Sequence, residues 1–108
     1  MAKHPQSIFG QRLRAAREIA GLPQDRLGVA IGLDEGCSSA RISRYETGAH
    51  EPPLAVAQKL AYALNVPVPY LYCPSDRLSE LLLATAKFDD AELKLLIEAA
   101  KGISKTHR

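Results

Sequence analysis

The chain has 108 residues, of which 46% are hydrophobic and 24% charged, and its formal net charge is +2. This length supports one domain with a modest hydrophobic core, and the composition excludes a disordered chain. The weak positive charge permits a nucleic-acid partner without indicating one, because nucleic-acid interfaces depend on local charge.

The cysteines and histidines are too scattered to predict a disulfide framework or a metal site. The cysteines, outside any CxxC pattern, are Cys37 and Cys73, and the histidines are His4, His50 and His107. Small disulfide-rich domains use more cysteines, and zinc sites need clustered ligands. We therefore expect no metal, no cofactor and a reducing, cytoplasmic environment. The sequence also lacks a signal-peptide pattern and any apolar run of about 18 residues, so we expect no membrane association.

Capping signals place two helices at the start of the chain. Ser7 is a suitable N-cap for a helix that runs to about Ala20 and is stopped by Gly21. Pro23 begins a second helix, which Gly32 closes. After the stretch GLDEGC, Ser38 or Ser39 can cap a third helix that runs to about Thr47 and is again ended by glycine.

Two prolines begin a fourth helix in EPPLAVAQKLAYALN, and a short helical piece follows in VPVPYLY. The expected buried residues of the fourth helix, which stops at Asn65, are Leu54, Ala57, Leu60, Ala61 and Leu64. No stretch alternates with period two for long enough to be a strand. The predicted fold class is all-α, with a bundle of five short helices followed by two C-terminal helices.

The two C-terminal helices are predicted within residues 75–108. Asp89 and Glu92 have the spacing of a capping box, which marks the start of the second of them. Leu83 and Leu95 lie off the main apolar stripes of their helices. The two helices therefore carry more apolar surface than one small bundle covers.

Two short helices separated by a turn are the helix-turn-helix arrangement. The blocks RLRAAREIAGLPQDRLGVAIG, ARISRYETG and EPPLAVAQKLAYALNVPVPYLY resemble the Xre-type family, which includes the Cro and lambda-repressor-like regulators. The resemblance covers residues 7–72. It implies a lambda-repressor-like bundle and a sequence-specific DNA-binding transcriptional regulator, with repression as the commoner output. The chain shows no nucleophile–base set, paired catalytic carboxylates or phosphate loop, so we expect no enzyme.

The resemblance also implies roles for single residues. Relatives pass from the second helix to the recognition helix in a tight turn, so LDEGCS is interpreted as a lengthened turn and SSARISRYE as the recognition helix. Arg17 and Glu46 match an internal ion pair of the family. The predicted DNA-binding residues are Gln24, on the phosphate backbone, and Ser38, Ser39, Ala40, Arg41, Ser43 and Arg44. Cys37, in the turn, is either a redox-sensitive thiol or, more simply, an unreactive one.

One recognition helix contacts too few base pairs to mark a single genomic site, so we expect a homodimer on a palindromic duplex operator. Residues 1–74 form the predicted DNA-binding domain, and residues 75–108 form a helical extension that is expected to pair the subunits. The predicted dimerisation residues are Leu81, Leu83, Leu95 and Leu96. The alternative is a protein-interaction module, such as an antitoxin-like neutraliser that acts through its C-terminal helices. The chain has no room for a large ligand-binding domain, so no small-molecule ligand is implied.

Overall fold

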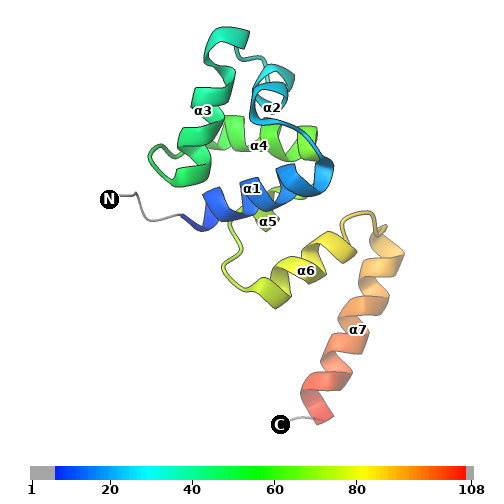
Figure 1. Cartoon of the computed structure of the whole chain (residues 1–108). Coiled ribbons are helices and arrows are strands. Elements are labelled where there is room, and N and C mark those ends of the chain that lie inside the picture. Colours follow the sequence, from blue (N-terminus) through cyan, green and yellow to red (C-terminus); the bar gives the residue numbers. More distant parts are fainter. Residues whose placement is uncertain (1–6, 107–108) are drawn as a thin grey trace.

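The computed structural model describes residues 7–106, and this range consists of helices and their connections, without strands (Figure 1). The helices within it are α1 (Ile8–Ala20), α2 (Gln24–Ala30), α3 (Glu35–Thr47), α4 (Leu54–Leu64), α5 (Val68–Leu71), α6 (Asp76–Ala84) and α7 (Asp90–Thr106). The first five helices form a bundle and the last two follow it, which confirms the predicted all-α fold class. His4 and His107 lie outside the described residues.

Local capping interactions set the ends of α1 and the end of α4 as predicted. The Ser7 hydroxyl accepts a hydrogen bond from the Gly10 backbone N–H at 2.8 Å and so caps α1. Gly21, with φ of 71°, ends the same helix in the left-handed conformation. Asn65, with φ of 57°, ends α4 in the same way, since asparagine tolerates this conformation better than most residues.

The hydrophobic core is supplied by all five helices of the bundle. Its fully buried large apolar residues come one from each helix and are Leu13, Leu27, Ile42, Leu60 and Leu71. The prediction that Leu54 is buried was wrong, because α4 begins at this residue and first reaches the core at Ala57.

The third helix begins earlier than the sequence interpretation placed it. The Asp34 carboxylate caps α3 by accepting a hydrogen bond from the Gly36 N–H at 3.3 Å, and the helix starts at Glu35. Only residues 31–34 separate α2 from α3, so the lengthened turn was wrong. The additional residues instead form an extra N-terminal turn of α3, where carboxylates interact favourably with the helix dipole. Cys37 therefore lies in the first turn of a helix and not in a loop.

Two glycines let α3 approach its neighbours closely. A Cβ atom on Gly10 of α1 would collide with the backbone carbonyl of Glu46 near the end of α3. A Cβ atom on Gly28 of α2 would collide with the side chain of Ser38 in the N-terminal half of α3. The backbones of α1 and α2 therefore pack closely against α3, and this close packing fixes the position of α3 on the bundle.

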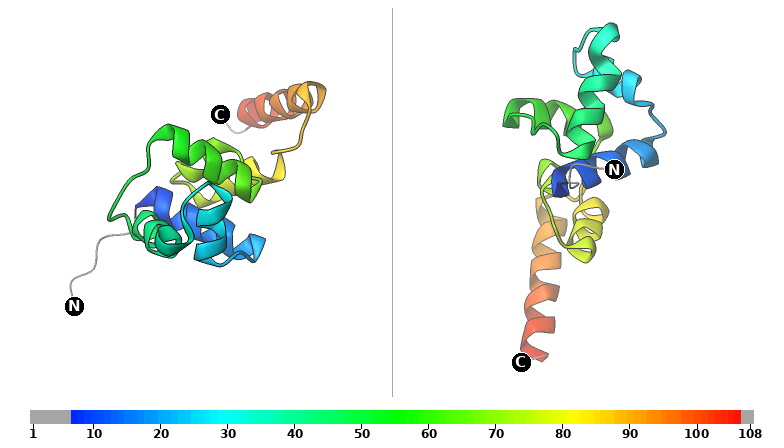
Figure 2. Two further views of the ribbon diagram at one scale, coloured as in Figure 1. Left: turned by 90° about the horizontal axis from the view of Figure 1, so that it is seen from above. Right: turned by 60° about the vertical axis from the view of Figure 1, so that its left-hand side comes forward.

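The two C-terminal helices, α6 and α7, follow the bundle along the chain. Helix α6 packs against α5, whereas α7 projects away, so α3 and α7 lie at opposite ends of the molecule (Figure 2). The predicted capping box forms: the Asp89 N–H donates to Glu92 Oε1 at 3.0 Å, and the Glu92 N–H donates to Asp89 Oδ1 at 2.8 Å. No residue of α7 between Asp90 and Thr106 is buried.

The surroundings of Gly36, in the extra turn of α3, and of Gly10, in α1, predict opposite effects for their substitution by alanine. Gly36→Ala should stabilise the protein by up to about 1 kcal/mol, because alanine favours a helix and the new Cβ would contact only Asp34 Oδ2, at 3.4 Å. Gly10→Ala should destabilise it by about 1–3 kcal/mol, because the carbonyl it meets belongs to the backbone. Urea denaturation measures both. A loss of stability in Gly36→Ala would contradict a helix that begins at Glu35.

Candidate nucleic-acid interface

Helix α3 has one face packed into the bundle and one face open to solvent. Its buried residues are Ser38, Ile42, Tyr45 and Glu46. Away from these lie the exposed residues Ser39, Ala40 and Arg44 and the half-buried residues Arg41 and Ser43. Five residues of the predicted DNA-binding set therefore lie on one helix, outside its buried face.

Ser38 does not belong to this open face, and its predicted contact with DNA is corrected. The side chain is 0% exposed, and its hydroxyl donates a hydrogen bond to the backbone carbonyl of Asp25 at 2.5 Å. Because α3 begins at Glu35, Ser38 lies inside the helix and four residues before Ile42, on the same buried face. Its role is to join α3 to α2 next to Gly28.

Gln24, the first residue of α2, lies between two side chains of α3. Its Nε2 donates a hydrogen bond to Glu46 Oε1 at 3.0 Å, and its Oε1 accepts one from the Ser39 hydroxyl at 3.4 Å. Both ends of the amide are thus used within the protein, where the sequence interpretation placed a contact with phosphate. The arrangement orients Ser39 at the edge of the open face.

Arg17 and Glu46 lie in contact through two hydrogen bonds. Arg17 Nε lies 2.6 Å from Glu46 Oε2, and Nη2 lies 3.2 Å from Oε1, while Nη1 donates to the Leu22 carbonyl at 2.9 Å. The side chains are only 14% and 5% exposed. The hydrogen bond with Glu46 raises the pKa of Arg17 above its ordinary value, so the guanidinium stays charged. With Gln24 on the same carboxylate, α1, α2 and α3 meet at Glu46.

The charge on α3 changes sign along the helix. Asp34 and Glu35 are exposed at its N-terminal end, whereas Arg41 and Arg44 lie further along. The sequence interpretation assigned no role to the two carboxylates, because it placed them in a turn. In the structure they belong to the end of the candidate recognition helix, so a phosphate backbone would be attracted to one part of the helix and repelled by the other.

Arg12 is a positioned residue that sequence reasoning missed. Its Nε donates to the Cys73 carbonyl at 2.8 Å, and its Nη2 lies 3.3 Å from the Pro74 carbonyl and 3.0 Å from Asp76 Oδ1. The side chain is 12% exposed. A signal for this burial was present, because Arg12 follows the buried Phe9 by three residues and so shares its face of α1.

Other kinds of site find no support in residues 7–106. No group of three or more His, Cys, Asp and Glu residues in this range is arranged to hold a metal ion. None of the helices described there is long and apolar enough to cross a membrane. Cys37 and Cys73 are free thiols, the first exposed and the second buried.

A helix-turn-helix domain family matches residues 8–69. The chain belongs to this helix-turn-helix family. Helices α2 and α3, with residues 31–34 between them, are its helix-turn-helix pair. Two curated relatives, from Sinorhizobium medicae (strain WSM419) and Rhizobium meliloti (strain 1021), are named uncharacterized HTH-type transcriptional regulators. Each is 30% identical over 63 residues, which is 58% of this chain but only 42% of the relative's length.

The chain is also similar to a solved helix-turn-helix protein. The crystal structure of the transcriptional regulator BswR shares 41% sequence identity and a TM-score of 0.79, over 86% of this chain and 92% of that one. The matched share, 86% of 108 residues, is larger than the 74 residues that precede the C-terminal extension, so at least part of the extension also has a counterpart there. The comparisons confirm the predicted helix-turn-helix family, and the names of the relatives are those of transcriptional regulators.

The buried ion pair predicts a large loss of stability for Arg17→Ala. The substitution leaves the Glu46 carboxylate buried without its two-bond partner, which should cost about 3–5 kcal/mol in denaturant unfolding. Arg14→Ala is the matched control: it removes an exposed pair with Glu18, 3.4 Å away on the same helix, and should cost less than about 0.5 kcal/mol. Equal effects of the two substitutions would show that solvent screens the Arg17–Glu46 pair.

Proposed function

We propose that this helix-turn-helix protein is a sequence-specific, DNA-binding transcriptional regulator of the Xre type, which places α3 in the major groove of duplex DNA. The observation that carries the proposal is the open face of α3, on a helix held firmly by α1 and α2. Ala40 lets the helix backbone approach the groove, and Arg44 extends from an exposed position. An arginine can donate two hydrogen bonds to guanine O6 and N7.

The individual roles follow from exposure and chemistry. Arg44 and Arg41 contact guanine bases, while Ser39 and Ser43 donate to bases or phosphates. Gln24 receives a role in addition to the one expected from the sequence. Its amide bonds Glu46 and Ser39 and so positions α3, while Nε2 keeps a second N–H that a phosphate can accept.

We further propose that the protein acts as a homodimer on a palindromic operator, with residues 1–74 binding DNA and residues 75–108 pairing the subunits. Support comes from α7, whose apolar side chains are uncovered; Leu95, for example, is 72% exposed. Exposed apolar surface of this extent is typical of an interaction site. Repression in the cytoplasm is the proposed output, since a small regulator bound at a promoter blocks transcription by occupying it.

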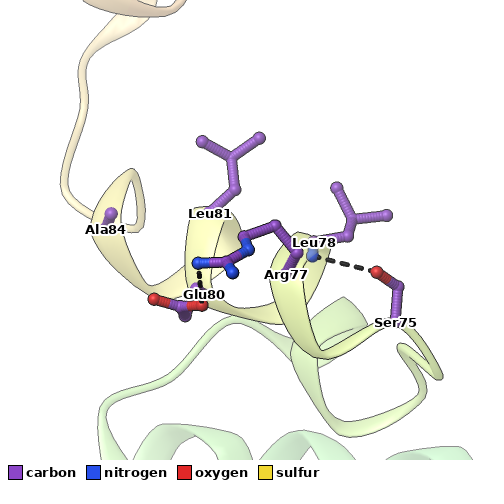
Figure 3. Close-up of a pocket in the computed structure, with 6 residues that line it drawn as sticks. All are labelled: Ser75, Arg77, Leu78, Glu80, Leu81 and Ala84. Atoms are coloured by element: carbon purple, nitrogen blue, oxygen red, sulfur yellow. Dashed lines mark hydrogen bonds and ion pairs between the residues drawn. The ribbon is translucent and has the colours of Figure 1, made fainter.

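The structure refines which leucines are available for pairing. Leu78 and Leu81 project from α6 above the ion pair of Arg77 and Glu80, on the side away from the bundle (Figure 3). Leu83 is half-buried and packs against the core, so it is withdrawn from the proposed interface. The remaining predicted residues are Leu81 and Leu95, which are exposed, and Leu96, which is half-buried.

A second candidate function rests on the same exposed helix. An uncovered α7 also fits a protein-interaction module that binds a different protein through its C-terminal helices, as an antitoxin-like neutraliser does. Salt-dependent retention on heparin and on duplex DNA separates the two functions, because cationic side chains that neutralise a polyanion release its counterions, and the interaction module needs no such contact. Retention on neither matrix would favour the interaction module.

Selection of bound duplexes from a random pool tests the proposed function and supplies an operator. On that operator, Arg44→Ala and Arg41→Ala should each weaken binding by about 1–3 kcal/mol and relax the preference at one base pair. Arg77→Ala, at an exposed position on α6, is the control and should bind normally. Equal losses on the selected and on random duplexes would instead make both arginines phosphate contacts.

The dimer is tested in the full-length chain, because Leu82 and Leu83 of the extension help to cover the core. Leu95→Glu and Leu81→Glu should convert the dimer to a monomer in sedimentation analysis and reduce binding of a palindrome to that of one half-site. Tyr62→Glu places the same charge at an exposed residue of α4 and should leave the dimer intact. A persistent dimer in both leucine variants would refute pairing through the extension.

A further inference from the structure

We propose that Arg12 is a positioning residue that sets the half-site spacing the dimer accepts. It does so by fixing the direction in which the C-terminal extension leaves the DNA-binding bundle. The inference rests on the proposed function, because spacing has a meaning only for a dimer that binds two half-sites through two copies of α3. The inference gives Arg12, which lies far from the open face of α3, a role in the selection of DNA sites.

The Arg12 side chain joins α1 to the short connection between α5 and α6. It donates to two successive backbone carbonyls of that connection, Cys73 at 2.8 Å and Pro74 at 3.3 Å, and pairs with Asp76 at the start of α6. A guanidinium holds its N–H groups in one plane at fixed angles, so these contacts restrict the orientation of the connection as well as its distance from α1.

Contacts on either side of Arg12 hold the same connection. The rings of Phe9 and Tyr72 pack with their centroids 5.3 Å apart, which holds the end of α5 against α1. The Ser75 hydroxyl then caps α6 by accepting a hydrogen bond from the Leu78 N–H at 3.1 Å. Helix α6 therefore starts from a connection that is tied to α1 and not from a free linker.

The other attachments of α1 extend this path to the recognition helix. Gly10 lets α1 lie directly against the end of α3, and Arg17 holds Glu46 of α3 through two hydrogen bonds. Helix α1 is thus fixed to α3 and, through Arg12, to α6. A rotation of α3 relative to α6 requires that one of these sets of contacts breaks.

A small rotation at this junction has a large effect on DNA. The molecule is 53 Å long, with α3 and α7 at its two ends. A tilt of roughly 10° acting over an arm of about 25 Å moves a recognition helix by about 4 Å, close to the rise of one base pair. In a symmetric dimer both recognition helices move, so a loose junction accepts several half-site spacings and a rigid one accepts few.

The carbonyl bonds of Arg12 matter more than its ion pair. The Asp76 side chain is 95% exposed, so water screens its attraction to Arg12. The Arg12 side chain is 12% exposed, and its 2.8 Å bond to the Cys73 carbonyl is partly buried and so better protected from water. Asp76→Asn should therefore change spacing preference much less than the loss of the guanidinium does.

The experiment uses the full-length protein and operators built from two copies of the selected half-site, with the centre-to-centre spacing varied one base pair at a time. Wild type should prefer its best spacing over neighbouring spacings by about tenfold or more. Arg12→Met keeps an apolar stem but removes every donor, and should reduce this preference to within about threefold. Affinity for a single half-site and the dimer seen by sedimentation should be unchanged. Arg14→Ala, on the same helix, should behave like wild type.

Arg12→Lys is the second variant, and it keeps the positive charge without the planar set of donors. It should fold and show an intermediate spacing preference, whereas a purely structural role for Arg12 would change stability and leave the preference unaltered. Wild-type spacing preference in a dimeric Arg12→Met or Arg12→Lys protein overturns the inference and leaves the proposed function standing. A wild-type protein that binds no operator, or binds as a monomer, overturns the proposed function itself.

Discussion

The carboxylate of Glu46 is the point on which the arrangement of the first three helices depends. It is 5% exposed and accepts hydrogen bonds from Arg17 of α1 and Gln24 of α2, while it belongs to α3. A buried ion pair adds little net stability compared with apolar packing, but breaking it leaves an unpaired charge. Other relative positions of the three helices are therefore unfavourable. Gln24 also accepts a hydrogen bond from Ser39, so the same set of hydrogen bonds reaches the edge of the face proposed to bind DNA.

Helix α1 connects the end proposed to bind DNA to the end proposed to pair the subunits, without belonging to either. Arg17 ties it to α3, and Arg12 ties it to the connection that begins α6. Both arginines lie largely inside the protein, so neither is available as a simple phosphate contact. These two arginines of α1 thus hold the helix in place, unlike the exposed Arg14. A positive charge in a DNA-binding bundle is not by itself evidence of a contact with DNA, and the partner atoms decide between the two roles.

The sequence predicted the features that depend on neighbouring residues. The caps at Ser7 and Asn65 and the capping box at Asp89 need only local chain geometry, so they could be recognised without the fold. The start of α3 was mistaken because two glycines and two serines favoured a loop, whereas Asp34 supplies the effective cap. Because of that error, Ser38 was predicted to lie on the surface, whereas it is buried. The partners of Arg12 could not be predicted locally, because they lie 61 to 64 residues away.

The extra turn of α3 gives a physical reason why the proposed dimer needs accurate spacing. Non-specific affinity for DNA comes mainly from neutralised phosphates, and the carboxylates of Asp34 and Glu35 at the tip of α3 oppose it. On α3 itself these two carboxylates offset the charges of Arg41 and Arg44, so one helix gains little from charge alone. The proposed dimer then depends more strongly on base contacts made by two recognition helices at once. Such contacts are lost when the second half-site is displaced by one base pair, so in the proposed dimer the attachments of α1 through Arg12 and Arg17 would help to distinguish the operator from other DNA.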